Sequence, residues 1–395
     1  MDFQRDPVLD ELARSVTRFV EREVLPVIER HERERTFPHA LIARMGELGF
    51  FGAAFGEEVG GSDAGFAAVA TVAEEISRLR PEFGYAMNMQ AMTCPFTIYT
   101  FGTDEQVMRF VPDLIRGRKI GMFALSEAGG GSDPAGAMQT TAVREGECYL
   151  LNGSKMWITF SDVCDTGVLF ARTDRAAGHQ GITAFIVEPK RFPGFRAEPI
   201  EMRGLSKCLR TSAAYLDDFE VPVENRLGGE GDGFKIAMSA LDYGRLTVSA
   251  RLTGLAQACY ERSIAYARER VVGGQAIGRY QMVQHQIADL AVEIEAARLL
   301  TQRTAWLMDQ GRPARRAAAH SKYFAGRTAR RAADAVTEIF GGYALADDYP
   351  VSYYGAYITM LCAGEGAPNV QRILIAEDAL GYKDADRHPV RRRAR

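Results

Sequence analysis

Apolar residues recur at helical spacing through the first part of the chain. Leu12, Val16, Phe19 and Val20 lie three or four residues apart, which places them on one face of a helix. Glycine pairs and an Arg-Pro step interrupt this pattern later and divide it into several helices. The pattern therefore predicts an N-terminal helical domain over residues 1–120.

The pattern changes near Gly121, where short apolar runs begin to alternate with turns. Val168-Leu169-Phe170 and Ile182–Val187 have the length and the β-branched or aromatic content of strands. Asn152-Gly153 predicts a tight hairpin turn between two such runs. The sequence therefore predicts an antiparallel β domain over residues 121–230.

Long helical patterns return after the glycine-rich segment at 228–233. Val283, Ile287, Leu290 and Ile294 form one apolar stripe, and further helical segments flank it, including one near the C-terminus. These patterns predict a C-terminal four-helix bundle over residues 231–383. Residues 384–395 are basic and are expected to form a disordered tail. The predicted fold class is mainly α with a β middle domain.

Composition narrows the functional classes. The chain has 395 residues, 47% of them apolar and 25% charged, as in ordinary globular proteins. The formal net charge of −3 gives no basic surplus for nucleic acid, and no apolar run approaches the ~20 residues of a membrane span. Six cysteines without a C-x-x-C pair indicate reduced thiols in a cytoplasmic protein and suggest no metal site. The first residues lack the apolar core of a signal peptide, which favours the same location.

One carboxylate has an unusual setting. Glu365 lies between Gly364 and Gly366, directly before the apolar helical segment Ile373–Ala376. A carboxylate placed there can face a cavity and act as a general base, provided that a substrate C–H bond can reach it. The alternative is a solvated glutamate that caps the last helix.

Two earlier segments add to this observation. Leu125–Asp133 reads LSEAGGGSD, and Lys155–Thr159 reads KMWIT, with an aromatic face and a hydroxyl on a predicted strand. Together with the Glu365 segment, their order and separation resemble the acyl-CoA dehydrogenases, flavoproteins that desaturate acyl thioesters. The resemblance extends over residues 7–383 and includes the order helical, β, helical. It implies the acyl-CoA dehydrogenase fold and FAD as the cofactor.

The resemblance also implies the cofactor contacts. The residues matched to the isoalloxazine site are Phe123, Leu125, Ser126, Ser132, Trp157 and Thr159. Those matched to the rest of FAD are Arg270, Gln281, Gly342 and Asn369. In the family some of these contacts come from a neighbouring subunit, so a homodimer or homotetramer is implied. The glycines at 129–131 are not read as a Rossmann loop, because a β domain follows them instead of a βαβ unit.

The implied reaction is α,β-dehydrogenation. Glu365 would take the Cα proton, and the flavin N5 would accept the Cβ hydride. The family's alternative base position reads Gly244, which cannot serve. The residues implied near the substrate are Gly131, Asp242, Arg245 and Gly366. For Asp242 and Arg245 the alternative is an ordinary i,i+3 ion pair on a helix surface.

Several positions depart from the family pattern. Gly273, Glu338 and Ala367 replace residues that often contact FAD, and a carboxylate at 338 would repel a pyrophosphate unless it has a partner. Gly355-Ala356 replaces an Arg-Asp pair and Gly364 replaces an aromatic residue, which predicts a remodelled cavity or subunit contact.

The carrier of the acyl group stays open between coenzyme A and an acyl carrier protein. An acidic carrier protein needs a basic docking surface, for which Arg315-Arg316, Arg327, Arg330-Arg331 and the C-terminal tail are candidates. An electron-transferring flavoprotein is the usual acceptor in the family. Two other functions are considered: a flavin monooxygenase on the same fold, and a non-catalytic helical interaction protein.

Overall fold

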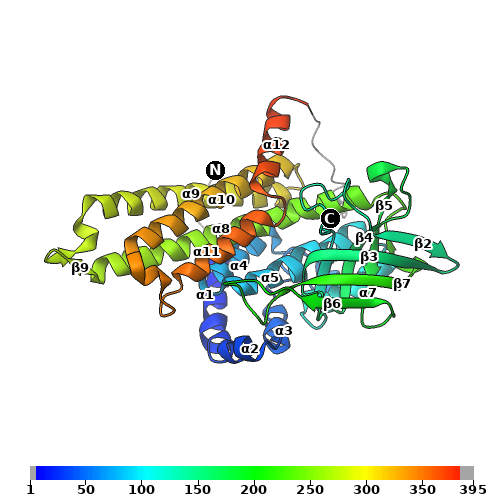
Figure 1. Cartoon of the computed structure of the whole chain (residues 1–395), viewed down its shortest axis with the longest axis horizontal. Helices are drawn as coiled ribbons and strands as arrows, with labels where there is room; N and C mark the ends of the chain where they lie inside the picture. The colour runs from blue at the N-terminus through cyan, green and yellow to red at the C-terminus, as the bar shows by residue number, and fades with distance from the viewer. Residues whose placement is uncertain (1–5, 383–395) are drawn as a thin grey trace.

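The computed structural model describes residues 6–382 and has three parts: the C-terminal helices extend to one end of the long axis, the β domain lies at the other, and the N-terminal helices pack against both (Figure 1). The N-terminal part is helical. Its helices are α1 Pro7–Phe19, α2 Ile28–Glu34, α3 His39–Glu47, α4 Gly65–Leu79, α5 Gly84–Ala86, α6 Pro95–Phe101 and α7 Asp104–Ile115. Two wider, π-helical segments lie between them: η1 Val20–Val24 and η4 Met87–Thr93.

Local sequence explains where these helices begin. The Asp6 carboxylate accepts a hydrogen bond from the Val8 N–H at the start of α1. Thr103 and Gln106 form a reciprocal capping box at the start of α7. α4 and η4 run through the interior, and every residue of η4 is buried. A π-helical turn inside a buried helix often marks a functional site.

The middle part is a β domain. Its strands are β1 Gly121–Ala124, β2 Thr141–Glu145, β3 Cys148–Thr159, β4 Thr166–Arg172, β5 Ile182–Val187, β6 Phe195–Pro199, β7 Thr211–Pro222 and β8 Arg226–Leu227. The strand order is β6-β7-β3-β2-β4-β5-β8, with β1 beside β4. Neighbours are antiparallel, except that β1 and β2 each pair with β4 in parallel.

The predicted hairpin at Asn152-Gly153 is wrong. Both residues lie inside β3, where the register against β7 shifts between Leu151 and Gly153. The bulge is held because Asn152 exchanges hydrogen bonds with Asp218, on the neighbouring strand. The actual turn between β2 and β3 is at Gly146, which has a φ of 59°.

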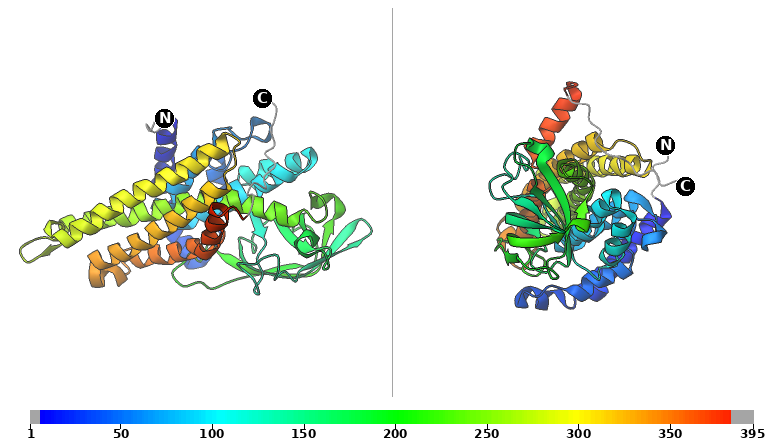
Figure 2. Two further views of the ribbon diagram at one scale, coloured as in Figure 1. Left: turned by 90° about the horizontal axis from the view of Figure 1, so that it is seen from above. Right: turned by 90° about the vertical axis from the view of Figure 1, so that its right-hand side faces the viewer.

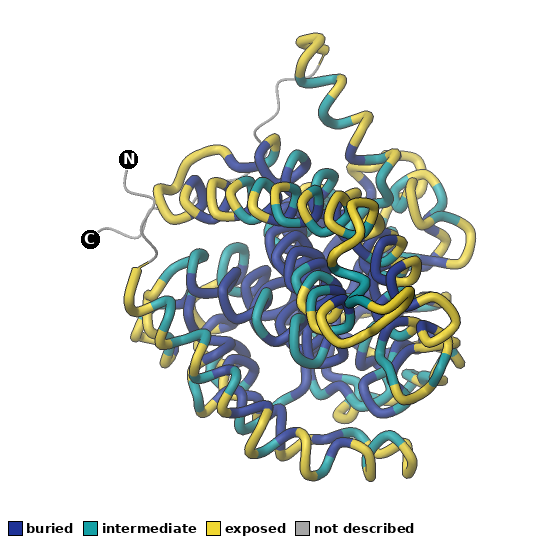
Figure 3. Tube along the Cα trace, turned by 90° about the vertical axis from the view of Figure 1, so that its left-hand side faces the viewer, coloured by how far each residue is buried: buried dark blue, intermediate teal, exposed yellow. Residues whose placement is uncertain are grey.

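The C-terminal part consists of long helices. They are α8 Gly233–Glu269, α9 Gln281–Asp309, α10 Arg315–Phe340, α11 Val351–Ala363 and α12 Pro368–Ala379, with the small ribbon β9 Val271–Val272 and β10 Gln275–Ala276 after α8. α8 is central and packs against α4, α9, α10 and α11 (Figure 2). Figure 3 shows the resulting buried interior, surrounded by exposed outer helical turns. The predicted stripe on α9 does face this core at Leu290 and Ile294.

The membership of the bundle differs in one respect from the prediction. α11, which the apolar pattern did not separate, packs on α8 and α10. The helix after Glu365 is α12, which packs on α10 and projects from the body (Figure 1). The basic tail predicted at 384–395 lies outside the described residues.

Candidate active site

Glu365 lies in the short link between α11 and α12. Its φ is 54° and that of Gly366 is 90°, both in the left-handed region that a non-glycine residue seldom adopts. This backbone turns the carboxylate toward α8. A Cβ atom built on Gly244 would lie 2.7 Å from Glu365 Cδ. A side chain at position 244 is therefore incompatible with this position of the carboxylate.

The two carboxylate oxygens of Glu365 have different surroundings. Asn88, in η4, donates from Nδ2 to Oε1 at 3.0 Å. The Thr247 hydroxyl donates to Asn88 Oδ1 at 2.6 Å, which fixes the orientation of the amide. Oε2 is buried and has no hydrogen-bond partner. The alternative of a solvated helix cap does not describe this glutamate, because the residue at the N-cap of α12 is Ala367.

The electrostatic setting of Glu365 favours proton exchange near neutrality. Burial raises the pKa of Glu365 to about 7, while the cations of Lys322, Arg245 and Arg251 and the hydrogen bond from Asn88 limit the rise. A general base is most effective when its pKa lies near the working pH.

Three side chains hold the backbone that carries Glu365. Arg245 Nε donates to the Glu365 carbonyl at 3.3 Å, and Lys322 Nζ donates to the carbonyl of Gly366. Gln371 Nε2 donates to the same Gly366 carbonyl at 2.9 Å. Arg245 also forms the i,i+3 ion pair with Asp242, but both residues are 4% exposed. The pair is thus interior and belongs to the site rather than to a helix surface.

The β domain contributes a second set of residues. The Met156 N–H donates to the Ser126 carbonyl at 2.9 Å, so the exit of β1 lies beside β3. Trp157 has a φ of 65° and is 57% exposed, although it is a large aromatic residue. Thr159 Oγ1 lies 3.3 Å from Thr211 Oγ1, and Phe123 packs edge-on against Phe170. An open aromatic face beside hydroxyl and main-chain groups fits a flat heterocycle such as the isoalloxazine of FAD.

Hydrogen bonds of the buried Glu127 side chain anchor the glycine-rich loop after β1. Glu127 is buried and accepts hydrogen bonds from the Gln139 N–H at 2.6 Å, the Thr140 hydroxyl at 2.6 Å and Lys155 Nζ at 2.8 Å. Ser132 and Gly131 lie on the exposed loop above this network. A Cβ atom on Gly131 would meet nothing within 4 Å, so this loop leaves open space at its surface.

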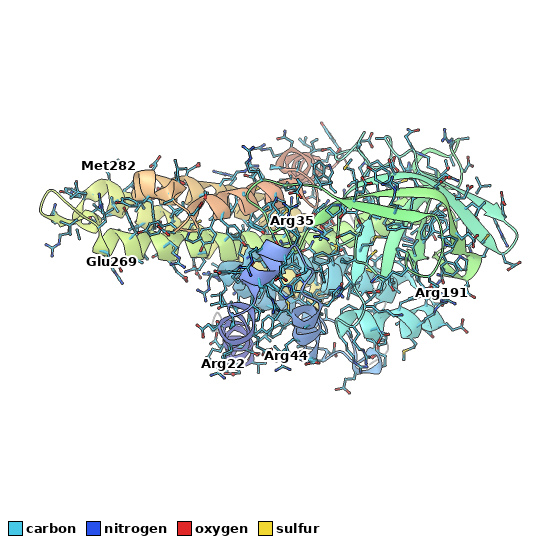
Figure 4. All side chains as sticks on the ribbon, turned by 60° about the horizontal axis from the view of Figure 1, so that its bottom comes forward. Arg22, Arg35, Arg44, Arg191, Glu269 and Met282 are labelled. Carbon is cyan, nitrogen blue, oxygen red and sulfur yellow. The ribbon has the colours of Figure 1, made fainter. Side chains whose placement is uncertain are left out.

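The other implied cofactor residues lie far from this region. Arg270 ends α8 and stacks over the Tyr343 ring at 5.5 Å, next to Gly342, while Gln281 begins α9. Figure 4 shows Glu269 and Met282 at one end of the molecule and Arg191 of the β domain at the other. The 25 residues from Arg245 to Arg270 span roughly 38 Å of helix.

A single chain therefore does not bring this remote set to the flavin residues of the β domain. Asn369, at the start of α12, is exposed as well and accepts a hydrogen bond from Arg372. The carboxylate of Glu338 has a partner within the chain, since it accepts a hydrogen bond from the Gln286 side chain. Ala356 packs near Gly204 of the β domain, at 3.0 Å from a Cβ built on that glycine.

The sequence analysis did not identify Asn88, Lys322, Arg251 or Gln371. A signal for two of them was present. Arg251 follows Val248 by three residues and precedes Leu255 by four, which places a charge on the buried stripe of a long helix. Lys322 lies similarly within an alanine-rich buried face of α10.

Within residues 6–382, no group of three or more histidine, cysteine or acidic side chains is arranged to hold a metal ion. No helix of the same residues is long and apolar enough to cross a membrane.

Comparison with known proteins places these observations in a family. Three family models match: the N-terminal domain of acyl-CoA dehydrogenase over residues 7–118, its middle domain over 122–219 and its C-terminal domain over 231–380. The glutaryl-CoA dehydrogenase of Desulfococcus multivorans is 38% identical, over 98% of this chain and 100% of its own length.

Solved structures agree with the family models. A glutaryl-coenzyme A dehydrogenase in complex with glutaryl-CoA superimposes with a TM-score of 0.92 at 37% identity, over 98% of this chain and 99% of the other. The FAD complex of PigA superimposes with a TM-score of 0.90 at 26% identity, over 96% and 99%. The cofactor is FAD. The chain belongs to the acyl-CoA dehydrogenase family, whose members are oxidoreductases acting on CH–CH bonds.

Proposed function

We propose that the protein removes hydrogen from Cα and Cβ of an acyl thioester, and that Glu365 is the base for the Cα proton. One observation carries this proposal: Glu365 Oε2 is buried and unpartnered, on a carboxylate whose pKa burial raises to about 7. A structural carboxylate in the same interior would have both oxygens satisfied. An oxygen with a free lone pair is suited to accept a proton from carbon.

FAD, when bound, supplies the acceptor for the Cβ hydride. The chain's own residues orient the reactants. Asn88 holds Oε1 of Glu365, so that Oε2 is the oxygen that takes the proton. Trp157 offers an aromatic face to the flavin ring, with Ser126 and Thr159 as hydrogen-bonding groups. Leu125, which is buried, Phe123, which packs against the same core, and Ser132, on the exposed loop after β1, are proposed as further contacts of the flavin.

The surroundings of Glu365 support a single base. Gly244 provides no carboxylate and leaves the volume that the Glu365 side chain occupies. The interior pair of Asp242 and Arg245 is proposed to line the substrate entrance, where Arg245 already holds the Glu365 carbonyl. Gly131 and Gly366 are proposed to let the thioester pass close to the backbone, because neither carries a side chain.

Coenzyme A is the proposed carrier of the acyl group. Two of the basic residues of α10 that would dock an acidic carrier protein, Arg316 and Arg331, are already paired with acids within the chain. Arg316 forms an ion pair with Asp378 at 3.1 Å, and Arg331 pairs with both Asp289 and Glu293. Such pairing lowers the positive potential that this surface presents to a partner. An electron-transferring flavoprotein is the proposed electron acceptor.

A homodimer or homotetramer is the proposed assembly. Arg270, Gln281 and Gly342 lie too far from the β domain to reach a flavin in their own chain, so a neighbouring subunit would receive them. The helical part also exposes large apolar side chains that need cover: Met282, Val292, Trp306, Leu345, Ile373 and Leu380. Sedimentation should give a flavin-loaded oligomer, and a flavin-loaded monomer would contradict this assembly.

Anaerobic bleaching of the flavin tests the function. Purified holoenzyme is mixed with a panel of acyl-CoA thioesters, and with the same acyl groups on an acyl carrier protein. We expect loss of flavin absorbance together with formation of the 2-enoyl thioester on coenzyme A. In a parallel aerobic assay, oxygen consumption with no enoyl product would favour a monooxygenase, and a protein that takes up no FAD would favour a non-catalytic role.

A further inference from the structure

The orientation of the Asn88 amide decides which oxygen of Glu365 stays free. Asn88 Nδ2 donates to Oε1 at 3.0 Å, and Oε2 is buried without a partner. A side-chain amide carries a donor at one end and an acceptor of similar size at the other, so a half-turn about its last bond exchanges them. After such a turn Asn88 Oδ1 would face Glu365 Oε1. A protonated Glu365 could then donate from Oε1, and its proton would be on the wrong oxygen.

Thr247 fixes the amide only while its hydroxyl proton points at Asn88. Its Oγ1 lies 2.6 Å from Asn88 Oδ1 and 2.9 Å from the carbonyl oxygen of Gly244. A hydroxyl has one proton to donate and two lone pairs that accept. With the proton turned to Gly244, the same oxygen would accept a hydrogen bond from Asn88 Nδ2. Thr247 by itself is therefore compatible with both orientations of the amide.

Arg251, on α8, is compatible with only one orientation. Its Nη1 lies 3.5 Å from Asn88 Oδ1. A guanidinium group has only donors and cannot accept a hydrogen bond. At 3.5 Å the hydrogen bond is long, but in a buried setting the cation still attracts the amide oxygen and would repel an NH₂ group in its place. Arg251 therefore makes the two orientations of Asn88 unequal in energy.

Packing holds the Arg251 guanidinium in this position. The residue is 2% exposed and lies over the Tyr85 ring at 5.3 Å. A Cβ atom built on Gly84 would overlap Arg251 Nε, so the guanidinium fills the space between α4, α5 and α8. Among residues 6–382 the structure records no ion pair between Arg251 and a carboxylate, and its Nε and Nη2 have no partner. A buried cation without an ion pair is costly to folding, so packing alone does not account for it.

We propose that Arg251 is a positioning residue, which keeps the Asn88 amide in one orientation and thereby reserves Oε2 of Glu365 for the substrate proton. This role rests on the proposed function, in which Glu365 is the base. In that step the Cα–H bond breaks and its proton bonds to Oε2. The electron pair of the broken bond forms the Cα–Cβ double bond as the Cβ hydride leaves for the flavin. Oε1 becomes the carbonyl oxygen of the neutral acid and keeps the hydrogen bond from Asn88 Nδ2.

Loss of Arg251 should make Glu365 a weaker acid in two ways. The amide of Asn88 would be able to turn when Glu365 is protonated, and Oε1–H would then donate to Asn88 Oδ1. The ionised form cannot make this bond, so the bond favours the neutral form and raises the pKa of Glu365. Removal of a nearby cation raises the same pKa through space. Less of Glu365 would then be ionised at any pH near neutrality.

The other charged groups around Glu365 stay in place when Arg251 is changed. They are the Asp242–Arg245 ion pair of α8 and Lys322 of α10. Two tyrosines also face Arg251. Burial raises the pKa of Tyr85 to about 12 and that of Tyr357 well above its ordinary value, so both are neutral at neutral pH.

Infrared difference spectroscopy of the FAD-loaded protein, without substrate, measures the titration of Glu365. The band of its neutral carboxyl group is identified by its absence in Glu365→Gln. The wild-type midpoint should lie near pH 7. Arg251→Lys keeps a group that only donates, and should titrate close to wild type. Arg251→Gln keeps a hydrogen-bonding group for Asn88 but can both donate and accept, so the direction is lost and the midpoint should rise by about one pH unit.

A double-mutant cycle separates the amide from the charge. In the Asn88→Ala background Arg251 can act on Glu365 only through space. The rise in midpoint caused by Arg251→Gln should therefore be larger by about 0.5–1 pH unit when Asn88 is present than when it is absent. Arg262→Gln removes an exposed arginine from the same helix and should leave the midpoint unchanged in both backgrounds. With an accepted thioester, kcat/KM of Arg251→Gln should fall about tenfold at pH 6 and little at pH 9.

Two results would overturn the positioning role of Arg251. A wild-type midpoint in Arg251→Gln would show that the amide keeps its orientation without the arginine. Equal rises with and without Asn88 would show that Arg251 acts only as a distant charge. If Arg251→Gln does not fold, Arg251→Met is titrated in its place, with the same rise expected because it also removes the direction. The proposed function fails separately, if no acyl thioester bleaches the wild-type flavin; the infrared titration needs no turnover and still decides the role of Arg251.

Discussion

Two buried clusters of charged residues differ in how completely their carboxylates are hydrogen-bonded. In the β domain, Glu127 is paired with Lys155, and its two oxygens also accept from Thr140 and from the Gln139 N–H. In the helical part, Glu365 has one partnered oxygen and one free, and Arg251 has two free donors. A satisfied cluster supports the structure around it, whereas an unsatisfied one keeps bonding capacity for a ligand.

Proton affinity follows the same division. Burial favours the neutral form of both carboxylates, but at Glu127 the pairing with Lys155 and the bond from Thr140 outweigh it and lower the pKa. At Glu365 burial prevails, and the pKa rises to about 7. Glu127 therefore stays ionised at neutral pH, while Glu365 is able to gain and lose a proton there.

The largest expected effect is on the rate, at the unsatisfied cluster. Glu365→Gln keeps the shape of the side chain but removes the proposed base. Flavin reduction by the substrate should slow by about 10²–10⁴-fold, since Gly244 offers no second carboxylate. FAD content and Tm should stay close to wild type, because Glu365 is not among the proposed FAD contacts and glutamine keeps its shape. Flavin reduction at the wild-type rate would mean that Glu365 is not the base.

Substitutions in the satisfied cluster of Glu127 and Lys155 should change the stability of the protein rather than the reaction rate. Glu127→Gln leaves Lys155 buried and uncompensated, and should lower the free energy of unfolding by about 3–5 kcal/mol. The double variant Glu127→Gln/Lys155→Met removes both charges and should recover much of this loss. Denaturant titration of the FAD-loaded protein measures both. Equal losses in the single and double variants would argue against the ion pair as the cause.

The order of the domains could be predicted from the sequence, because helical and strand periodicities are local. The structure at Asn152-Gly153 could not be predicted in this way. Its dipeptide favours a hairpin, but pairing with Asp218, more than 60 residues away in the chain, turns it into a bulge. The contact that decided the local structure was therefore long-range. α11 was missed for a related reason, since its apolar content alone does not separate it from the flanking links.

Of the residues in the candidate site, some could be found from local sequence and others only from the packing of distant helices. Glu365 was identified from its glycine-flanked segment, which is local. Its partners Asn88, Arg251 and Lys322 come from three different helices. Which faces of these helices meet depends on packing, so a single sequence gives only a weak sign, namely a charge on an otherwise apolar stripe. Gly244 was noted as lacking a base, but its role as the space for Glu365 required the structure.

Gly244→Ala tests that space and should have an intermediate effect. The added Cβ would lie 2.7 Å from Glu365 Cδ, so the carboxylate has to move. A displacement of about 1 Å from the reacting geometry costs up to ~10²-fold in rate. Folding should survive, because Gly244 is inside a helix and alanine is a better helix former. Wild-type kcat/KM with the variant would show that Glu365 does not need this position to react.

Lys322→Met should have the smallest effect, a shift in the pH profile rather than a loss of the reaction. In the proposed mechanism the ionised form of Glu365 is the active one, so kcat/KM for flavin reduction should rise with pH and reach half its maximum near pH 7. The Lys322 cation favours the ionised form, and its removal should raise the pKa of Glu365 and move the profile to higher pH by roughly one unit. The rate at pH 6 should therefore fall about tenfold, while the rate at pH 9 should change little. Lys322→Arg keeps the charge and should keep the wild-type midpoint. A loss of rate that is equal at pH 6 and pH 9 would instead assign Lys322 to holding the Gly366 carbonyl, and the electrostatic role would have to be given up.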